Sequence, residues 1–184
     1  VLVAPLEGIG RVQLLHNKDD SQFVSIAFCE PFRAAGGTAQ TLAVLIDEII
    51  RRELGVVAYK ARFDEVERVK EEFGLYRGNL QYRPPPEEVE MIVPACPVMV
   101  NGESTENIEC SGYRDLENIE GNRVRGGVVR VIGEGLSLTA AKVKKQTVDL
   151  ENSGWAFFSL CANIWKDSIG NGRSGRHRRS IEPN

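Results

Sequence analysis

Arginine and paired glycines occur together at two places in the chain. "RAAGGTAQ" covers residues 33–40 and "GNRVRGG" covers residues 121–127. Glycines ahead of a helix allow backbone N–H groups to converge on one point, and the partial positive charge of a helix N-terminus favours an anion there. An arginine adds a planar guanidinium that can bind a phosphate through two hydrogen bonds. Both segments are therefore candidate contacts for phosphate or a nucleic-acid backbone.

Two interpretations of these segments stay open. In the first, the residues bind phosphate or DNA; the candidates are Arg33, Gly36, Gly37, Thr38, Asn122, Arg123, Arg125, Gly126 and Gly127. In the second, the glycines form tight turns and the arginines of the later motif pair with Asp115, Glu117 or Glu120. Exposed ion pairs of that kind contribute only about 0–1 kcal/mol. The spacing of the residues is compatible with both interpretations.

The sequence offers little support for catalysis. "RAAGGTAQ" lacks the lysine of a GxxxxGK[ST] loop, and neither GxSxG nor HExxH occurs. The adjacent Asp19 and Asp20 lie in an expected turn, where their side chains diverge. The four cysteines are widely spaced without a CxxC pair, so we expect reduced, mostly buried thiols in an intracellular protein and no zinc site. We predict no catalytic and no metal-binding residue in this chain.

Composition indicates a folded chain with an uneven charge distribution. Of 184 residues, 42% are hydrophobic and 27% are charged, which suits a single domain with a real core. Residues 1–110 carry 11 basic and 18 acidic groups (−7), and residues 111–184 carry 12 and 8 (+4). Any contact with a polyanion is therefore expected in the second part. No apolar run approaches the roughly 20 residues that span a bilayer, and the opening at Val1 indicates a fragment or a processed chain without a signal peptide.

The elements that would position these motifs begin with a β-hairpin over residues 12–29. Its turn covers residues 17–20, and Val24, Ile26 and Phe28 alternate with small residues as in a half-buried strand. A helix follows with Thr38 as N-cap and Gly55 as its C-terminal stop. Its expected buried stripe is Leu42, Leu45, Ile46, Ile49 and Ile50.

Shorter elements occupy the middle of the chain. A helix is expected from Glu65 to Phe73, with Asp64 and Glu67 as a capping box, Gly74 as its stop and a solvated acidic outer face. Another runs from Pro86 to Pro94. The pair Asn101-Gly102 favours a type I′ hairpin turn, with Ile108 and Cys110 on the returning strand.

The later part of the chain carries a longer helical pattern. Residues 123–145 show an apolar stripe at helical spacing: Val124, Val128, Ile132, Leu136, Ala140 and Val143. Val129 and Val131 also fit a strand, but the length of the stripe favours a helix. The four glycines in this stretch lower helix propensity by about 1 kcal/mol each, so their presence indicates close backbone packing or close approach of a ligand. The fold class is therefore α+β: a mixed module over residues 1–150 with a hairpin near the N-terminus, amphipathic helices and short strands. Residues 151–184 form an aromatic segment and a basic, flexible tail.

The segments "PFRAAGGTAQTLAVLIDEIIRRELG", "ECSGYRDLENIEGNRVRGG" and "EGLSLTAAKVKK" resemble the large subunit of the archaeal family D DNA polymerase. The resemblance covers about residues 5–155, as the N-terminal part of a much longer subunit. It implies DNA-templated nucleotide addition with Mg²⁺ by the whole protein, catalytic aspartates in a double-psi barrel far downstream, and a small subunit with a 3′–5′ exonuclease. The partners it implies are DNA, that small subunit and the rest of the large subunit, in the cytoplasm.

The resemblance transfers no catalytic residue and no cofactor to this chain. It implies a scaffold that contacts DNA or other subunits. The alternatives from the residues alone are a separate nucleic-acid-binding module, motivated by the basic second part, and a purely structural domain whose arginine–glycine motifs fix its own turns.

Overall fold

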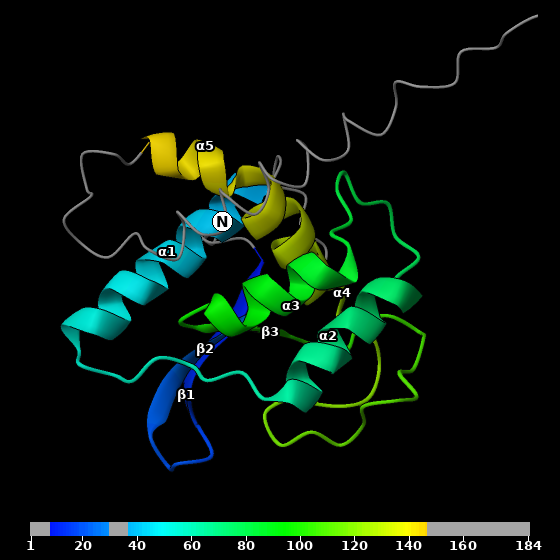
Figure 1. Ribbon diagram of the computed structural model, residues 1–184, viewed down its shortest axis with the longest axis horizontal. Coiled ribbons are helices and arrows are strands. Elements are labelled where there is room, and N and C mark those ends of the chain that lie inside the picture. The colour runs from blue at the N-terminus through cyan, green and yellow to red at the C-terminus, as the bar shows by residue number, and fades with distance from the viewer. Residues whose placement is uncertain (1–7, 30–36, 147–184) are drawn as a thin grey trace, which may run out of the picture.

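The computed structural model describes residues 8–29 and 37–146 (Figure 1). In chain order the elements are β1 (Ile9–His16), β2 (Gln22–Phe28), α1 (Thr38–Glu53), α2 (Phe63–Leu75), α3 (Pro86–Ala95), β3 (Met99–Gly102), α4 (Gly126–Arg130), η2 (Val131–Ser137) and α5 (Leu138–Gln146). A small sheet is surrounded by helices, which confirms the α+β class. The proposed boundary at residue 150 and the segment 151–184 lie outside the described residues. Within the described part, no helix is both long and apolar enough to cross a membrane.

The three-stranded sheet has the order β1-β2-β3. β1 and β2 are antiparallel, with Leu14 opposite Val24, so the expected hairpin is confirmed. The central strand β2 is buried on both faces and not on one, because Val24, Ile26 and Phe28 belong to the main core while Phe23 packs with Tyr59, Met99 and Ile119 on the other face.

The expected hairpin turn at Asn101-Gly102 is wrong. Both residues belong to β3, which pairs in parallel with β2 and places Gly102 opposite Phe28. A Cβ on Gly102 would lie 2.7 Å from the Phe28 carbonyl oxygen. The glycine therefore serves close strand contact instead of a turn. Ile108 and Cys110 do not return alongside β3, since their backbone groups bond to Val124 and Asn122.

Helix α1 begins and ends where the sequence predicts, with one shift at its start. The N-cap is Gly37, with a φ of 68°, and not Thr38, which is the first helical residue. A side chain at Gly37 would overlap the Glu134 carbonyl of η2, so glycine is required both by the backbone angle and by the packing. Gly55 has a φ of 66° and follows the C-cap, as expected of a helix stop.

The buried side of α1 differs from the predicted stripe. Val44 and Leu45 face the core, whereas Ile46 and Ile50 are about half exposed, at 50% and 48%. Leu42 and Ile49 are partly buried. The prediction is therefore right for Leu45 and in part for Leu42 and Ile49, but the buried side also includes the polar residues Thr41 and Glu48, which turns Ile46 and Ile50 outward.

The helical stretch that ends the described region runs through α4, η2 and α5 without interruption. The burial of the predicted stripe is confirmed, since all six of its residues are at most 2% exposed, but the helix begins at Gly126, so Val124 lies outside it. Its glycines allow close packing: a Cβ on Gly127 would lie 2.5 Å from the Phe28 carbonyl oxygen, and one on Gly133 would lie 2.9 Å from that of Tyr82. In Figure 1, η2 lies between α1 and α2, while α5 lies at the top of the view, above α1.

Helices α2 and α3 cover the opposite side of this stretch from α1 (Figure 1). α2 is longer than predicted at both ends, and Gly74 lies inside it. The N-terminal hydrogen bond joins Arg62 N to Glu65 Oε2 at 2.9 Å, so the expected capping box between Asp64 and Glu67 is wrong by two residues. α3 starts at Pro86 as predicted and runs one residue past Pro94.

Candidate functional site

The motif at residues 121–127 lies between a short backbone pairing and the start of α4. Cys110 N donates to Asn122 O at 2.8 Å and Val124 N donates to Ile108 O at 2.9 Å. Arg125 is the N-cap residue of α4. The pairing holds the motif against the loop that precedes it and aims alternate side chains in opposite directions.

The side chain of Arg125 points inward and is fully buried. Its Nε and Nη2 donate to Glu72 Oε1 and Oε2 at 2.8 and 2.9 Å, a bidentate pair between a guanidinium and a carboxylate. Its Nη1 donates to Asn101 Oδ1 at 2.8 Å. Arg125 therefore ties α4 to α2 and β3, and has no exposed atom with which to contact a phosphate.

Glu72 is shared between two arginines. Arg68, one turn earlier on α2 and also fully buried, donates from Nε to Glu72 Oε1 at 3.0 Å. The remaining Arg68 donors bind backbone carbonyls, Tyr113 O at 2.7 Å and Arg123 O at 3.0 Å. Carbonyl groups of the loop that contains the motif thus stabilise the positive charge of Arg68. These hydrogen bonds compensate for the water that the guanidinium loses on burial.

A second carboxylate of α2 extends the network. Glu65, 1% exposed, accepts from the Tyr59 hydroxyl at 2.7 Å and from Asn118 Nδ2 at 3.0 Å. Burial, and then the Glu65 charge, raise the pKa of Tyr59 well above its ordinary value, so the hydroxyl remains a proton donor.

Glu71 holds the same loop from its outer side. Its carboxylate accepts backbone N–H bonds from Ser111 at 2.6 Å, Gly112 at 3.1 Å and Tyr113 at 3.3 Å. Partial burial opposes ionisation of Glu71, but these N–H bonds outweigh it and lower the pKa. The three N–H groups form a concave anion site that the protein's own carboxylate fills.

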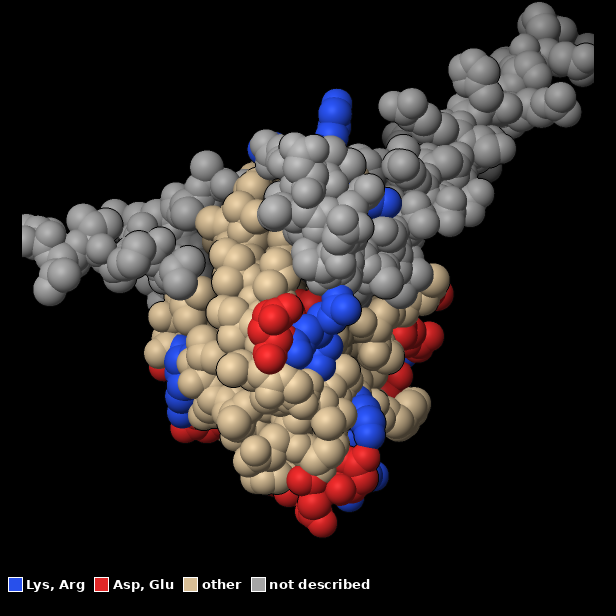
Figure 2. All heavy atoms as spheres, turned by 90° about the vertical axis from the view of Figure 1, so that its left-hand side faces the viewer, with Lys and Arg blue, Asp and Glu red and all other residues tan. Residues whose placement is uncertain are grey.

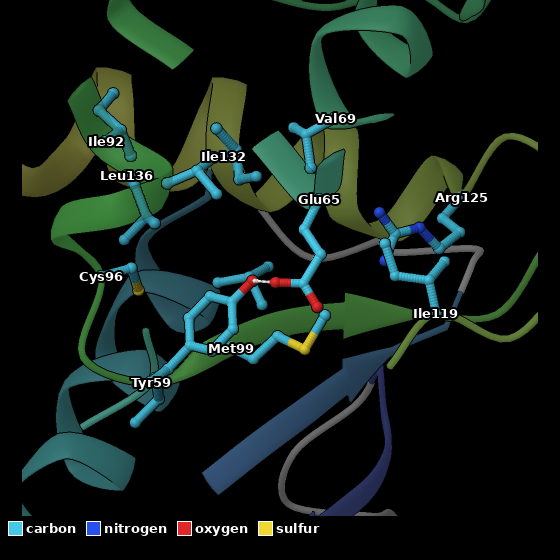
Figure 3. Close-up of a pocket in the computed structure, with 13 residues that line it drawn as sticks. Tyr59, Glu65, Val69, Ile92, Cys96, Met99, Ile119, Arg125, Ile132 and Leu136 are labelled. Atoms are coloured by element: carbon cyan, nitrogen blue, oxygen red, sulfur yellow. Dashed lines mark hydrogen bonds between the residues drawn. The ribbon is translucent and has the colours of Figure 1, made fainter. Parts of the chain in front are cut away.

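A small cavity lies beside the network (Figure 3). Its volume of about 20 Å³ is room for roughly one water molecule, too little for a nucleotide or another substrate. Tyr59, Glu65 and Arg125 reach its wall, and the other lining residues are mostly aliphatic. The Cys96 thiol lies on the same wall, and burial raises its pKa to about 12, which makes it a poor nucleophile.

The other residues of the motif have different environments. Asn122 and Asp115 form a reciprocal pair, with Asp115 N donating to Asn122 Oδ1 and Asn122 Nδ2 donating to Asp115 Oδ1, both at 2.8 Å. Gly126 and Gly127 are buried at the start of α4. Arg123 alone among the motif's charged groups is exposed, and its guanidinium has no hydrogen-bond or ion-pair partner among the described residues.

The earlier motif is described only in part. Gly37 and Thr38 lie at the start of α1 against η2, while Arg33 and Gly36 lie outside the described residues. The structure therefore does not bring the two motifs together as one described site.

The carboxylate partners expected for the motif arginines are wrong. Asp115, Glu117 and Glu120 bind other residues: Asn122, Arg62 and Arg11. The true partner of Arg125 comes from α2, whose charged side was predicted to be solvated. Glu65, Arg68 and Glu72 are instead the most deeply buried charges of that helix, because the long loop needs hydrogen-bonding partners inside the fold. Their signal in the sequence is a spacing of three and four residues, next to the apolar stripe of Val66, Val69 and Phe73.

Chemically, this arrangement positions backbone and does not activate a nucleophile. Its carboxylates accept hydrogen bonds from arginine, tyrosine and amide donors. Among residues 8–29 and 37–145, no three side chains of His, Cys, Asp and Glu come together as metal ligands.

Comparison with known proteins agrees with the resemblance in the sequence. A family model described as "DNA polymerase II large subunit DP2, N-terminal" matches residues 1–163, eight residues beyond Trp155. The DNA polymerase II large subunit of Methanococcoides burtonii is 48% identical over 170 residues, and that of Methanocella arvoryzae is 50% identical over 157. These alignments cover 91% and 84% of this chain but 15% and 14% of the relatives. The chain thus spans about a seventh of the length of the curated relatives that it matches.

Proposed function

Because this chain belongs to the family of N-terminal regions of DNA polymerase II large subunits, we propose that it is a scaffold module of a replicative DNA polymerase in an archaeal cytoplasm. The whole enzyme carries out DNA-templated nucleotidyl transfer. Its partners are DNA and a small subunit with 3′–5′ exonuclease activity. The module itself supports neighbouring parts of the large subunit and forms no bonds in the substrate.

The observation that carries the scaffold role is the position of Arg125. An arginine in a phosphate clamp keeps its guanidinium accessible, whereas this guanidinium is 0% exposed and bound to Glu72 and Asn101. Its charge is used inside the fold to join three elements. This supports the interpretation in which the motif fixes its own turns.

The Mg²⁺ ion of such a polymerase does not fit the described residues. A Mg²⁺ site needs one or two carboxylates with free oxygens that face an open space. Glu65 and Glu72 accept hydrogen bonds from Tyr59 and from two arginines, and the cavity beside them holds about one water. The proposal therefore assigns the metal to the part of the large subunit beyond this chain.

Primer extension tests the proposal directly. The 184-residue chain, the full-length large subunit and its complex with the small subunit are assayed with Mg²⁺ on a primed template. Synthesis is expected from the complex, and none from the 184-residue chain. Metal-dependent incorporation by the short chain would contradict the scaffold role, and an inactive complex would contradict the polymerase activity.

Contact with a nucleic-acid backbone is a second candidate function. Arg123 favours it, because its side chain is exposed and has no partner within the described part of the chain. Each phosphate contact contributes about one unit to the salt dependence of binding. Fluorescence anisotropy with a labelled oligonucleotide is expected to show weaker binding and a salt slope reduced by about one for Arg123→Ala. The control is Arg11→Ala, another exposed arginine, which pairs with Glu120 at 2.9 Å. Equal affinity of wild type and Arg123→Ala at low salt would exclude this contact.

A further inference from the structure

Helix α1 exposes an apolar side to solvent. Its core side is formed by Thr41, Val44 and Glu48, whereas Ile46 and Ile50 on the opposite side are 50% and 48% exposed. Polar residues of α1 are thus buried while two isoleucines are exposed, the reverse of an ordinary amphipathic helix, in which the apolar side is covered. The covering structure for this side of α1 is absent from the described residues.

The exposed apolar surface continues beyond α1. Leu54, directly after the helix, is 71% exposed, and Val57 is 41% exposed. On β1, Val12 and Leu14 are 53% and 49% exposed. We call the set the α1–β1 face: Val12, Leu14, Ile46, Ile50, Leu54 and Val57.

Val12 and Leu14 lie opposite Ile26 and Val24 on β2, so they point to the side of the sheet on which α1 packs. Figure 2 views the side on which Figure 1 places α1 and β1, and uncharged atoms cover much of the described surface there. Charged groups occur as small clusters within it. Large exposed apolar patches mark interaction sites in soluble proteins.

Asp47, which lies beside this face, needs a hydrogen-bond donor. It precedes Ile50 by three residues on α1, and its Oδ2 atom is buried without a hydrogen-bond partner. Burial raises its pKa to about 6. Buried carboxylate oxygens almost always have a donor. A structure that covers the α1–β1 face is therefore expected to bring a hydrogen-bond donor or a cation to Asp47.

We infer that the α1–β1 face is the docking surface for a later segment of the same large subunit, which covers it with apolar side chains and gives Asp47 a donor. The relatives are about seven times longer than the aligned region, so most of the subunit lies beyond this chain. The described residues end with α5, which is joined to α1 by the Thr41–Thr139 hydroxyl pair at 2.8 Å. The last described helix thus packs against α1. The inference rests on the proposed function, because it assumes the full-length subunit.

The low charge of the α1–β1 face argues against two other occupants, a DNA backbone and a transient protein partner. A DNA backbone would require cations at the surface, and the face is formed by aliphatic side chains. A transient partner would be expected to meet a more polar surface, whereas permanent interfaces resemble a core cut in half. A segment of the same polypeptide is a permanent neighbour.

Hydroxyl-radical footprinting with mass spectrometry tests the inference. Oxidation of Ile46, Ile50 and Leu54 is compared between the 184-residue chain, the full-length large subunit and the complex with the small subunit. We expect at least a fivefold lower oxidation rate at these residues in the full-length subunit alone. Phe63 and Met91, which are 74% and 51% exposed and lie off this face, are the internal controls and should change less than twofold.

Each other outcome overturns the inference. Equal oxidation in the short chain and the large subunit would leave the face uncovered. Protection that appears only with the small subunit would assign the face to that partner. Protection in the short chain that rises with its concentration would assign it to a second copy.

A matched pair of variants gives an independent readout. Ile50→Lys and Met91→Lys place the same charge on two similarly exposed sites. Ile50→Lys should leave the melting temperature of the short chain unchanged and increase the protease sensitivity of the full-length subunit several-fold, whereas Met91→Lys should change neither. Equal sensitivity of the two variants would refute the docking role. Primer extension is measured separately, so a failure of the polymerase assignment is distinguishable from a failure of this surface.

Discussion

Replacing Arg125 with alanine is the sharpest test of the buried network. The change removes two hydrogen bonds to Glu72, at 2.8 and 2.9 Å, and one to Asn101, at 2.8 Å. Glu72 keeps only Arg68 as a charged partner in a site without exposure to water. Breaking a buried pair by removing one partner costs about 3–5 kcal/mol. For a chain of this size, that corresponds to a fall in melting temperature of roughly 6–20 °C.

Arg123→Ala is the matched control for this prediction. The two arginines are two residues apart, but the Arg123 side chain is exposed, and the group that Arg68 binds is its backbone carbonyl. Alanine keeps that carbonyl, so the change in stability should stay within about 0.5 kcal/mol. Thermal and urea unfolding followed by circular dichroism measure both variants. In a double-mutant cycle, Arg125→Ala with Glu72→Ala should be clearly less destabilised than the sum of the single variants.

Two results would refute the reasoning. If Arg125→Ala melts within about 2 °C of the wild type, the buried pair does not stabilise the fold. If that variant also loses DNA affinity, Arg125 is a phosphate contact in a conformation other than the one described. If the losses of unfolding free energy in Arg125→Ala and Glu72→Ala simply add in the double variant, the two residues act independently.

Three further predictions concern other parts of the fold. Gly127→Val should destabilise by at least about 2 kcal/mol, since its side chain meets the Phe28 carbonyl, and an unchanged urea midpoint would contradict this packing. Because the folded-state pKa of Asp47 is raised to about 6, the folded state binds the proton more tightly and stability falls as pH rises from about 4 to 6. Asp47→Asn should therefore raise stability at pH 7 by up to about 1 kcal/mol after solvent screening and have no effect below pH 4, as measured by urea unfolding at both pH values. Because the pKa of Glu71 is lowered in the folded state, its carboxylate stabilises the fold above the ordinary carboxyl pKa, and this stabilisation is lost in acid. Glu71→Ala should speed amide hydrogen exchange at Ser111 at neutral pH, and unaltered exchange would count against this contact.

Local pattern was sufficient for most of the elements. The helix that begins at Thr38, the hairpin around residues 17–20 and the stripe from Val124 to Val143 follow from periodicity and from turn residues, which act over a few positions. The glycines of the later stripe also indicated close packing correctly, because glycine inside a helix has a local energetic cost that some contact must offset.

The site was predictable only in part. The sequence identified Arg125 as a candidate functional residue but did not identify its partner. Glu72 is 53 residues away, and the charged side of α2 was expected to be exposed to solvent. The Asn101-Gly102 pair favours a turn locally, yet a parallel strand partner and the hydrogen bond from Arg125 hold it in β3. In both cases a contact distant in sequence outweighs a preference of about 1 kcal/mol or less.

The sequence by itself determined the first hairpin, the positions of most helices and the family of the chain, because propensity, periodicity and motif order are properties of neighbouring residues. Only the tertiary structure decided which sides of α1 and α2 are inside. Ile46 and Ile50 face solvent although their spacing is typical of a core, while Arg68 and Glu72 are buried although they are charged. Burial depends on the other elements that pack against a residue, and a charge can be buried when the fold supplies its counter-charge and hydrogen bonds.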